Sequence, residues 1–161
     1  MKKSDLIEAL ALAPHPTEGG YFRRTFESPL SIDVAHSRRN IASSIYYLLT
    51  DDNPHSYLHR NKSHIIHCHH CGSPIRYTVI SPNGRIAHHV LGSDLSRGQV
   101  PQLHVQGGDW KISELMTGEY GLISEVVVPG FNYEDNEIAT VEQISALFPD
   151  LIDHIRPYIK P

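Results

Sequence analysis

Histidine and cysteine are concentrated in one short stretch of the chain, residues 55–72 (HSYLHRNKSHIIHCHHCG). This stretch holds six of the twelve histidines and both cysteines. Imidazole and thiolate are common ligands of borderline metals, and histidine is the side chain best suited to proton transfer near neutral pH. The stretch therefore suggests a metal site or an acid–base site. The alternative is that these residues lie on a solvent face or at an interface between copies of the chain.

A second set of reactive side chains lies in HPTEGGYFR, residues 15–23, where Glu18, Tyr21 and Arg23 fall within six residues. Gly19 and Gly20 allow the backbone to approach another group closely. In a strand, Tyr21 and Arg23 point to one face, so both are candidates for lining a pocket. The alternative is a turn followed by an edge strand with a solvated arginine.

Two further segments combine turn residues with aromatic and charged side chains. The lone tryptophan, Trp110, and Lys111 follow the pair Gly107-Gly108. Trp110 is either a pocket wall or part of the core. In residues 129–135 (PGFNYED), Phe131 and Tyr133 either close over the mouth of a cavity or belong to an ordinary loop. The chain has no dinucleotide-binding, phosphate-loop or nucleophile-elbow motif.

Length and composition indicate one globular domain, residues 1–161, with an apolar fraction of 40% and a charged fraction of 20%. The net charge is −4 and there is no basic run, so nucleic acid is not an expected partner. No apolar run has the ~20 residues that a membrane span needs. The start of the chain reads as a helix and not as a signal peptide, which predicts a cytoplasmic protein with free thiols at Cys68 and Cys71.

The expected elements are mostly short strands separated by turn signals. A helix is predicted from about Asp5 to Leu12, with Ser4 as its cap, and a loop is predicted over residues 28–40. Asn83-Gly84 between two β-prone runs predicts a hairpin. The other expected elements are strands over 21–27, 43–50, 57–60, 64–71, either side of Gly107-Gly108 and up to Pro129-Gly130, then helices over 140–148 and 150–158. This order favours a β-sandwich or barrel.

Several segments together resemble a small, mostly bacterial family of the cupin superfamily. They are PHPTEGGYFRRTFES at 14–28, SSIYYLLT at 43–50, LHRNKS at 58–63, VLGSDLSRGQVPQ at 90–102, GGDW at 107–110 and VVVPGFNYEDNEIA at 126–139. The resemblance implies a mainly β fold: a double-stranded β-helix, or jelly-roll barrel, with a short N-terminal helix, one or two C-terminal helices and a pocket inside the barrel. It also implies a homodimer, and its nearest analogues are the sugar-epimerase-like and seed-storage-like cupins.

Cupins often bind a divalent metal through histidines and a glutamate, and this chain departs from that pattern. His59 matches the first motif. His64-Ile65 stands where acidic residues are expected, Cys68 where a histidine is expected, and Lys111 where the second motif has a histidine. The resemblance is therefore compatible only with a non-standard ligand set, such as His59 with Cys68 and His70, and no cofactor beyond such a metal is indicated.

Three functions follow from these residues. The first is a cupin that binds a small sugar-like or anionic metabolite and acts as an isomerase or epimerase by proton transfer, with His59 as base and Tyr21 or Tyr133 as acid. Its expected ligand-binding residues are Glu18, Arg23, Arg60, Trp110, Lys111 and Phe131. The second function is ligand binding or sensing without turnover, and the third is a metal-dependent enzyme that uses the non-standard ligand set.

Overall fold

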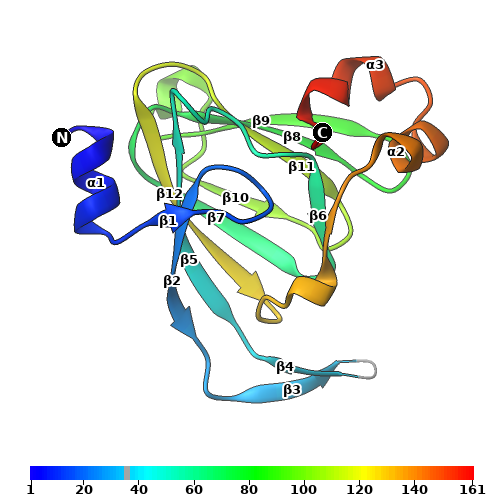
Figure 1. Ribbon diagram of the computed structural model, residues 1–161, viewed down its shortest axis with the longest axis horizontal. Coiled ribbons are helices and arrows are strands. Elements are labelled where there is room, and N and C mark those ends of the chain that lie inside the picture. The colour runs from blue at the N-terminus through cyan, green and yellow to red at the C-terminus, as the bar shows by residue number, and fades with distance from the viewer. Residues whose placement is uncertain (35–36) are drawn as a thin grey trace.

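The protein is mainly β, as predicted, with two antiparallel sheets packed face to face in a jelly-roll barrel (Figure 1). The computed structural model describes residues 1–34 and 37–161. The six-stranded sheet has the order β1-β2-β5-β12-β7-β10 and the five-stranded sheet the order β13-β6-β11-β8-β9. The strands of the first sheet are β1 (Ala13–Pro14), β2 (Tyr21–Glu27), β5 (Ser43–Thr50), β12 (Tyr120–Val128), β7 (His64–Gly72) and β10 (Gln102–Val105). Those of the second are β13 (Asn136–Ile138), β6 (His59–Asn61), β11 (Trp110–Leu115), β8 (Ile75–Ile80) and β9 (Ile86–Leu91).

The space between the sheets is apolar over one part and polar over the other. Alternate residues of β5, β8, β10, β11 and β12 fill the apolar part, among them Leu49, Tyr77, Leu103, Leu115 and Ile123. Because side chains alternate along a strand, the same alternation directs charged residues of β6, β11 and β12 into the polar part. The barrel interior therefore contains both a packed core and a candidate site.

Helices cover the outer faces of both sheets, on opposite sides of the molecule (Figure 1). The N-terminal helix α1 (Lys3–Ala9) and Leu12 pack on Leu48 and Leu122 of the six-stranded sheet. At the other side, α2 (Val141–Leu147), α3 (Ile152–Ile155) and the 3-10 turn η3 (Arg156–Tyr158) pack on the five-stranded sheet. The cluster beneath them includes Trp110 and Ile112. The expected N-terminal and C-terminal helices are thus confirmed.

The prediction of a loop over residues 28–40 is wrong for most of that segment. Strands β3 (Ser31–Val34) and β4 (Ser37–Asn40) pair there as a separate hairpin, which projects away from the two sheets (Figure 1). The segment is mostly polar, so a short alternation of apolar and polar residues in it was overlooked. Ile32 and Val34 share a face of β3. The remainder of the predicted loop includes Ala35 and His36, which lie outside the described residues.

The predicted N-terminal helix begins and ends earlier than expected. Its N-cap is Lys2 and not Ser4, and the Lys2 backbone N–H donates to the Asp5 carboxylate over 3.0 Å. The helix ends at Ala9, two residues before Ala11, which has a φ of 48°. In contrast, the hairpin over residues 81–84 is confirmed, with β8 and β9 paired on either side of it and Gly84 at a φ of 82°.

The cysteines and the helices bear on two smaller expectations, free thiols and the lack of an apolar run long enough to span a membrane. Cys68 and Cys71 are free, as predicted. Over residues 1–34 and 37–161, no helix has the length and apolar character needed to cross a bilayer. The structure also has the short 3-10 turns η1 (Leu95–Arg97) and η2 (Tyr133–Asp135).

Candidate functional site

A pocket opens into the polar part of the barrel. Its volume is about 30 Å³. A cavity needs about 10–15 Å³ to hold one water, so the pocket has room for a small group. Its lining consists of His15, Glu18, Phe22, Arg24, Ile45, His59, Ile65, Lys111, Glu125, Val127, Phe131, Tyr133 and Asn136.

The turn between β1 and β2 delivers Glu18 into this pocket. Gly20 has a φ of 69°, and a Cβ atom placed there would lie 2.8 Å from the backbone oxygen of Leu48. The turn is also tied to the barrel, because the Tyr47 hydroxyl donates to the Gly19 carbonyl over 3.0 Å. A glycine is therefore required at position 20, as the sequence suggested, and the carboxylate of Glu18 is buried as a result.

Two side chains hold the Glu18 carboxylate. The Asn136 amide donates to Oε1 over 2.8 Å. His15 Nδ1 accepts the Glu18 backbone N–H over 3.0 Å, so in the neutral ring the hydrogen is on Nε2, which lies 3.9 Å from Oε2. The carboxylate is thus fixed in position, and Oε2 remains available on the side of His59.

His59 presents a bare ring nitrogen to the pocket. Its Nδ1 lies 2.7 Å from the Tyr57 carbonyl oxygen, which can only accept, so Nδ1 carries the hydrogen. Nε2 is buried without a hydrogen-bond partner and lies 3.4 Å from Oε2 of Glu18. Burial lowers the pKa of His59, Glu18 opposes that effect, and Lys111 adds to it. The ring is therefore neutral near pH 7, with the lone pair of Nε2 directed towards the pocket.

Lys111, Glu125 and His67 form a buried charged network behind His59. Lys111 lies directly opposite His59 on neighbouring strands, and Glu125 lies directly opposite His67. Lys111 Nζ and His67 Nδ1 are 3.7 and 3.2 Å from Oε1 of Glu125. Burial alone would raise the pKa of Glu125, but Lys111 and His67 reverse this and hold it well below its usual range. Glu125 is therefore the anionic partner of the Lys111 ammonium.

Two tyrosines at the base of the network stay protonated. Burial raises the pKa of Tyr47 and of Tyr77 well above the usual value, and the carboxylates of Glu18 and Glu125 add to the effect. The Tyr77 hydroxyl lies 3.0 Å from Nδ1 of His67. These phenols therefore act as neutral hydrogen-bonding groups and not as anions.

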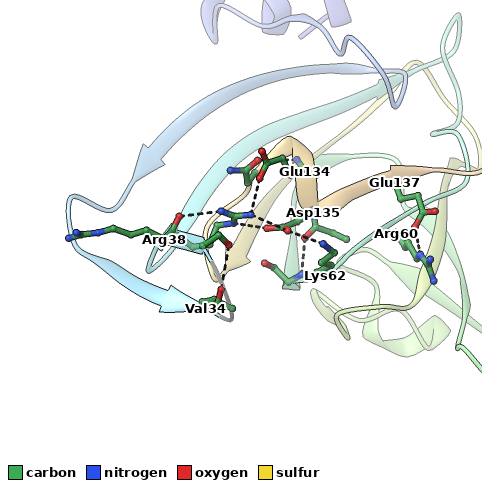
Figure 2. A network of polar contacts seen from close by, with 12 residues as sticks. Val34, Arg38, Arg60, Lys62, Glu134, Asp135 and Glu137 are labelled. Carbon is green, nitrogen blue, oxygen red and sulfur yellow. Dashed lines mark hydrogen bonds and ion pairs between the residues drawn. The ribbon is translucent and has the colours of Figure 1, made fainter.

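Residues 129–135, here called the mouth loop, line the pocket through Phe131 and Tyr133, whose rings meet edge to face at 5.0 Å. Arg39 of β4 donates to both oxygens of Asp135, over 2.7 and 3.2 Å, and Lys62 lies 3.5 Å from the same carboxylate. Figure 2 shows this network between the β3–β4 hairpin and the barrel. The mouth loop is thus held in place by ion pairs from both sides.

The structure brings together some of the residues proposed from the sequence and separates others. Glu18, His59, Lys111, Phe131 and Tyr133 all line the pocket. Tyr21, Arg23, Arg60, Trp110, Cys68 and His70 do not.

Tyr21 and Arg23 lie on the outer face of the six-stranded sheet, which corrects the expectation that they look into the pocket. Tyr21 packs with the cluster under α1, and the Arg23 guanidinium lies 5.7 Å from the centroid of the Tyr46 ring. Alternation places their neighbours, Phe22 and Arg24, inside. The alternation along the strand was therefore predicted correctly, but the face expected to line the pocket was the wrong one.

Arg60 and Trp110 lie on the outer face of the five-stranded sheet. Trp110 is 1% exposed in the cluster beneath the C-terminal helices, so it belongs to the core. The Arg60 guanidinium stacks over its ring at 4.6 Å and pairs with Glu137 over 2.6 Å. Neither side chain reaches the pocket.

The residues proposed as metal ligands are not brought together. His59 points into the barrel, whereas Cys68 and His70 lie on the outer face of the six-stranded sheet, where His70 meets the Tyr46 ring at 5.9 Å. Among the described residues, no group of three or more His, Cys, Asp or Glu side chains could hold a metal ion. The nearest approach is Glu18 with His59 and His15, but His15 Nδ1 already accepts backbone N–H groups and its Nε2 carries hydrogen. The donor set therefore does not fit the metal that the resemblance implies.

Sequence reasoning missed Glu125, His67, His15, Asn136 and Arg24. A signal for Glu125 is present: in the strand 120–128 it shares a face with Ile123 and Val127, so it is an acid on a buried apolar face. His67 likewise shares a face with Ile65. A charged or polar residue on the inward face of a predicted strand points to a buried partner or a site.

The fold is that of a cupin, and comparison with known proteins identifies the family. Residues 4–139 match the family described as Cupin superfamily (DUF985), and the chain belongs to it. It is 39% identical over 146 residues to the uncharacterized protein YML079W of Saccharomyces cerevisiae, covering 81% of this chain and 72% of that one.

Solved structures agree with this assignment. A hypothetical protein from Leishmania major has a TM-score of 0.92 at 30% identity, with 100% of both chains covered. Protein SO0799 from Shewanella oneidensis has a TM-score of 0.90 at 30% identity, covering 100% of this chain and 99% of that one. Oxalate decarboxylase from Bacillus subtilis, at 16% identity and a TM-score of 0.57, covers 91% of this chain and 37% of its own and shares the fold alone.

Proposed function

We propose that this cupin binds a small, sugar-like or anionic carbonyl metabolite in the barrel and moves a proton next to its carbonyl group, as an isomerase or epimerase. One observation carries the proposal: the buried Nε2 of the pocket residue His59 has no hydrogen-bond partner, burial lowers the pKa of this ring, and Lys111 lies directly opposite on the neighbouring strand. Carbon deprotonation next to a carbonyl needs a neutral base and a cation at the developing oxyanion, and these two side chains supply both.

The other lining residues take supporting roles in this proposal. Glu18 accepts a hydrogen from the substrate and orients it, and Phe131 covers the pocket. Tyr133 is the candidate acid at the mouth, and Arg24 is the cation available to an anionic substituent. Arg24 pairs with Glu27 over 2.9 Å on a partly exposed surface, so a ligand anion can share or replace that partner.

A deuterium-exchange experiment tests the proposal. Hydroxyacetone, methoxyacetone and butanone are incubated with the protein in D₂O, and deuterium at the carbon next to the carbonyl is followed by NMR. The wild-type protein is expected to exceed the uncatalysed rate for at least one compound. The His59→Gln variant is expected to lose about 10²–10⁴-fold of that enhancement, the usual contribution of a general base.

Controls separate the base from a change in folding. His64→Gln removes an exposed histidine that contacts His104 outside the pocket, and it should leave the rate unchanged. Thermal unfolding of each variant checks that it folds. No wild-type enhancement with any compound, or an enhancement that His59→Gln leaves intact, would contradict the proposal.

Ligand binding without turnover is the second candidate, and one observation favours it. Tyr133, the proposed acid, is 55% exposed, so it is not sequestered from water. Thermal-shift screening against sugars, nucleotide sugars and organic acids would identify such a ligand by a raised Tm. Stabilisation that depends on Glu18 and His59, without deuterium exchange, would support this second function.

Homodimer formation and a cytoplasmic location stay predictions from the sequence. Light scattering of the purified protein tests the first. A mass of twice 18.1 kDa would support a dimer.

A further inference from the structure

The inner end of the pocket presents two hydrogen-bond acceptors side by side. Nε2 of His59 has a lone pair, because the hydrogen of the ring is on Nδ1. Oε2 of Glu18 lies 3.4 Å from it. A neutral imidazole nitrogen and a carboxylate oxygen are both acceptors and cannot bond to each other without a hydrogen between them. Each is therefore complementary to a ligand group that supplies a hydrogen. A ligand hydroxyl supplies such a hydrogen.

A donor faces the same space. Lys111 is the direct cross-strand neighbour of His59, so their side chains start on one face at a Cβ separation of about 4.5–5.5 Å. Its ammonium has three hydrogens, and its anionic partner, Glu125, is 3.7 Å away. Lys111 therefore has hydrogens left for a ligand oxygen that accepts, such as a carbonyl.

The charges nearest the inner end also favour a hydrogen-donating group. Glu125 is balanced by Lys111, whereas Glu18 is held by Asn136, which is neutral, and has no lysine or arginine among its ion-pair partners in the described residues. A ligand carboxylate placed next to Glu18 would be repelled by the negative charge of the Glu18 carboxylate. An anionic substituent instead fits Arg24, which lines the pocket with a side chain that is 39% exposed.

We infer that the substrate is an α-hydroxycarbonyl compound, of the kind found in open-chain sugars, with its hydroxyl on Glu18, the hydrogen of its hydroxyl-bearing carbon facing Nε2 of His59, and its carbonyl oxygen on Lys111. The inference rests on the proposed function and specifies its substrate.

The implied reaction is a shift of the carbonyl group by one carbon. His59 Nε2 takes the proton of the hydroxyl-bearing carbon, the C–H pair forms the C=C bond, and the carbonyl oxygen becomes an oxyanion beside Lys111. Glu18 takes the hydroxyl proton and passes it to that oxyanion. His59 then returns its proton to the former carbonyl carbon as the hydroxyl oxygen becomes the new carbonyl. Atoms and electrons balance with no oxidant or cofactor.

Hydroxyacetone and methoxyacetone form a matched pair of probes, because they differ only in whether the oxygen next to the carbonyl carries hydrogen or methyl. Deuterium exchange at the shared CH₂ group is measured for each and divided by its uncatalysed rate. The normalised rate for hydroxyacetone is expected to be at least about tenfold higher, as one hydrogen bond to a charged group allows. Glu18→Gln should reduce this ratio more than it reduces the rate for methoxyacetone.

The outcomes separate this inference from the proposed function. Equal normalised rates for the two ketones would overturn the α-hydroxycarbonyl assignment and leave proton transfer by His59 standing. Exchange with none of the three ketones, hydroxyacetone, methoxyacetone and butanone, would overturn both. Exchange confined to hydroxyacetone, together with formation of lactaldehyde, its carbonyl-shifted isomer, would support both.

Discussion

Removing the Lys111 ammonium should destabilise the protein strongly, because it leaves Glu125 buried without its cation. Lys111 and Glu125 are 3% and 6% exposed, and their nearest atoms are 3.7 Å apart. Breaking a buried ion pair by removing one partner costs about 3–5 kcal/mol. For a chain of this length that corresponds to a loss of about 6–20 °C in Tm for Lys111→Met.

The pH dependence of this cost follows from the sign of the pKa shift. In the wild type the pKa of Glu125 is held below its usual value of 4.5, so its stabilisation is present above that pH and is lost as the pH falls through the folded pKa. In Lys111→Met, burial without the cation raises the pKa instead. The variant should therefore recover stability as the pH falls from 7 to 5, and the gap to the wild type should narrow.

Urea unfolding of four proteins at pH 7 and pH 5 measures these free energies. The double variant Lys111→Met/Glu125→Gln should regain much of the loss, since it leaves no unpaired charge. Lys62→Met is the matched control, because the Lys62 side chain is 77% exposed and its ion pair should contribute at most about 1 kcal/mol. A Lys111→Met cost below about 1 kcal/mol, or one that does not change with pH, would refute the reasoning.

Three further predictions concern the turn, the mouth loop and the base. Gly20→Ala should lower the free energy of unfolding in urea by about 1–3 kcal/mol, because it adds a Cβ 2.8 Å from a backbone oxygen at a residue with positive φ. The control Gly98→Ala, which has open space around the added Cβ, should lower it less. Equal losses for the two variants would contradict the close approach at Gly20. Arg39→Ala should speed backbone hydrogen exchange of residues 131–135, because the substitution removes an ion-pair partner of Asp135. Raised salt should have the same effect on the wild type, since salt screens this ion pair. Unchanged exchange would show that the ion pairs do not hold the mouth loop. Any deuterium-exchange activity should rise with pH with a midpoint below 6.5, because burial lowers the pKa of His59 and its neutral form is the base; a midpoint above 6.5 would contradict this.

The fold was largely predictable from the sequence because it depends on local signals that act independently of one another. Asn83-Gly84 specifies a hairpin wherever it occurs between β-prone runs, and the run 43–50 becomes strand β5 with the predicted bounds. The polar hairpin β3–β4 was missed because its strands have only four residues each and few apolar positions to show a period.

The site was less predictable, since it depends on which face of each strand is turned inward. Alternation showed that Tyr21 and Arg23 share a face, but the inward face belongs to Phe22 and Arg24. Packing of β2 against β5 and α1 determines which face of β2 is turned inward. These long-range contacts cannot be read from the sequence of β2 alone. The pairing of Glu125 with Lys111 likewise joins two strands from opposite sheets.

The central claim is that His59 is neutral near pH 7, with hydrogen on Nδ1 and a bare Nε2 in the pocket. Long-range ¹H–¹⁵N correlation spectra of the imidazole rings, with His59→Gln used for assignment, report the protonation of each ring nitrogen directly. We expect a protonated Nδ1 and an unprotonated Nε2 at pH 7. A ring protonated on both nitrogens, or one with its hydrogen on Nε2, would contradict the account.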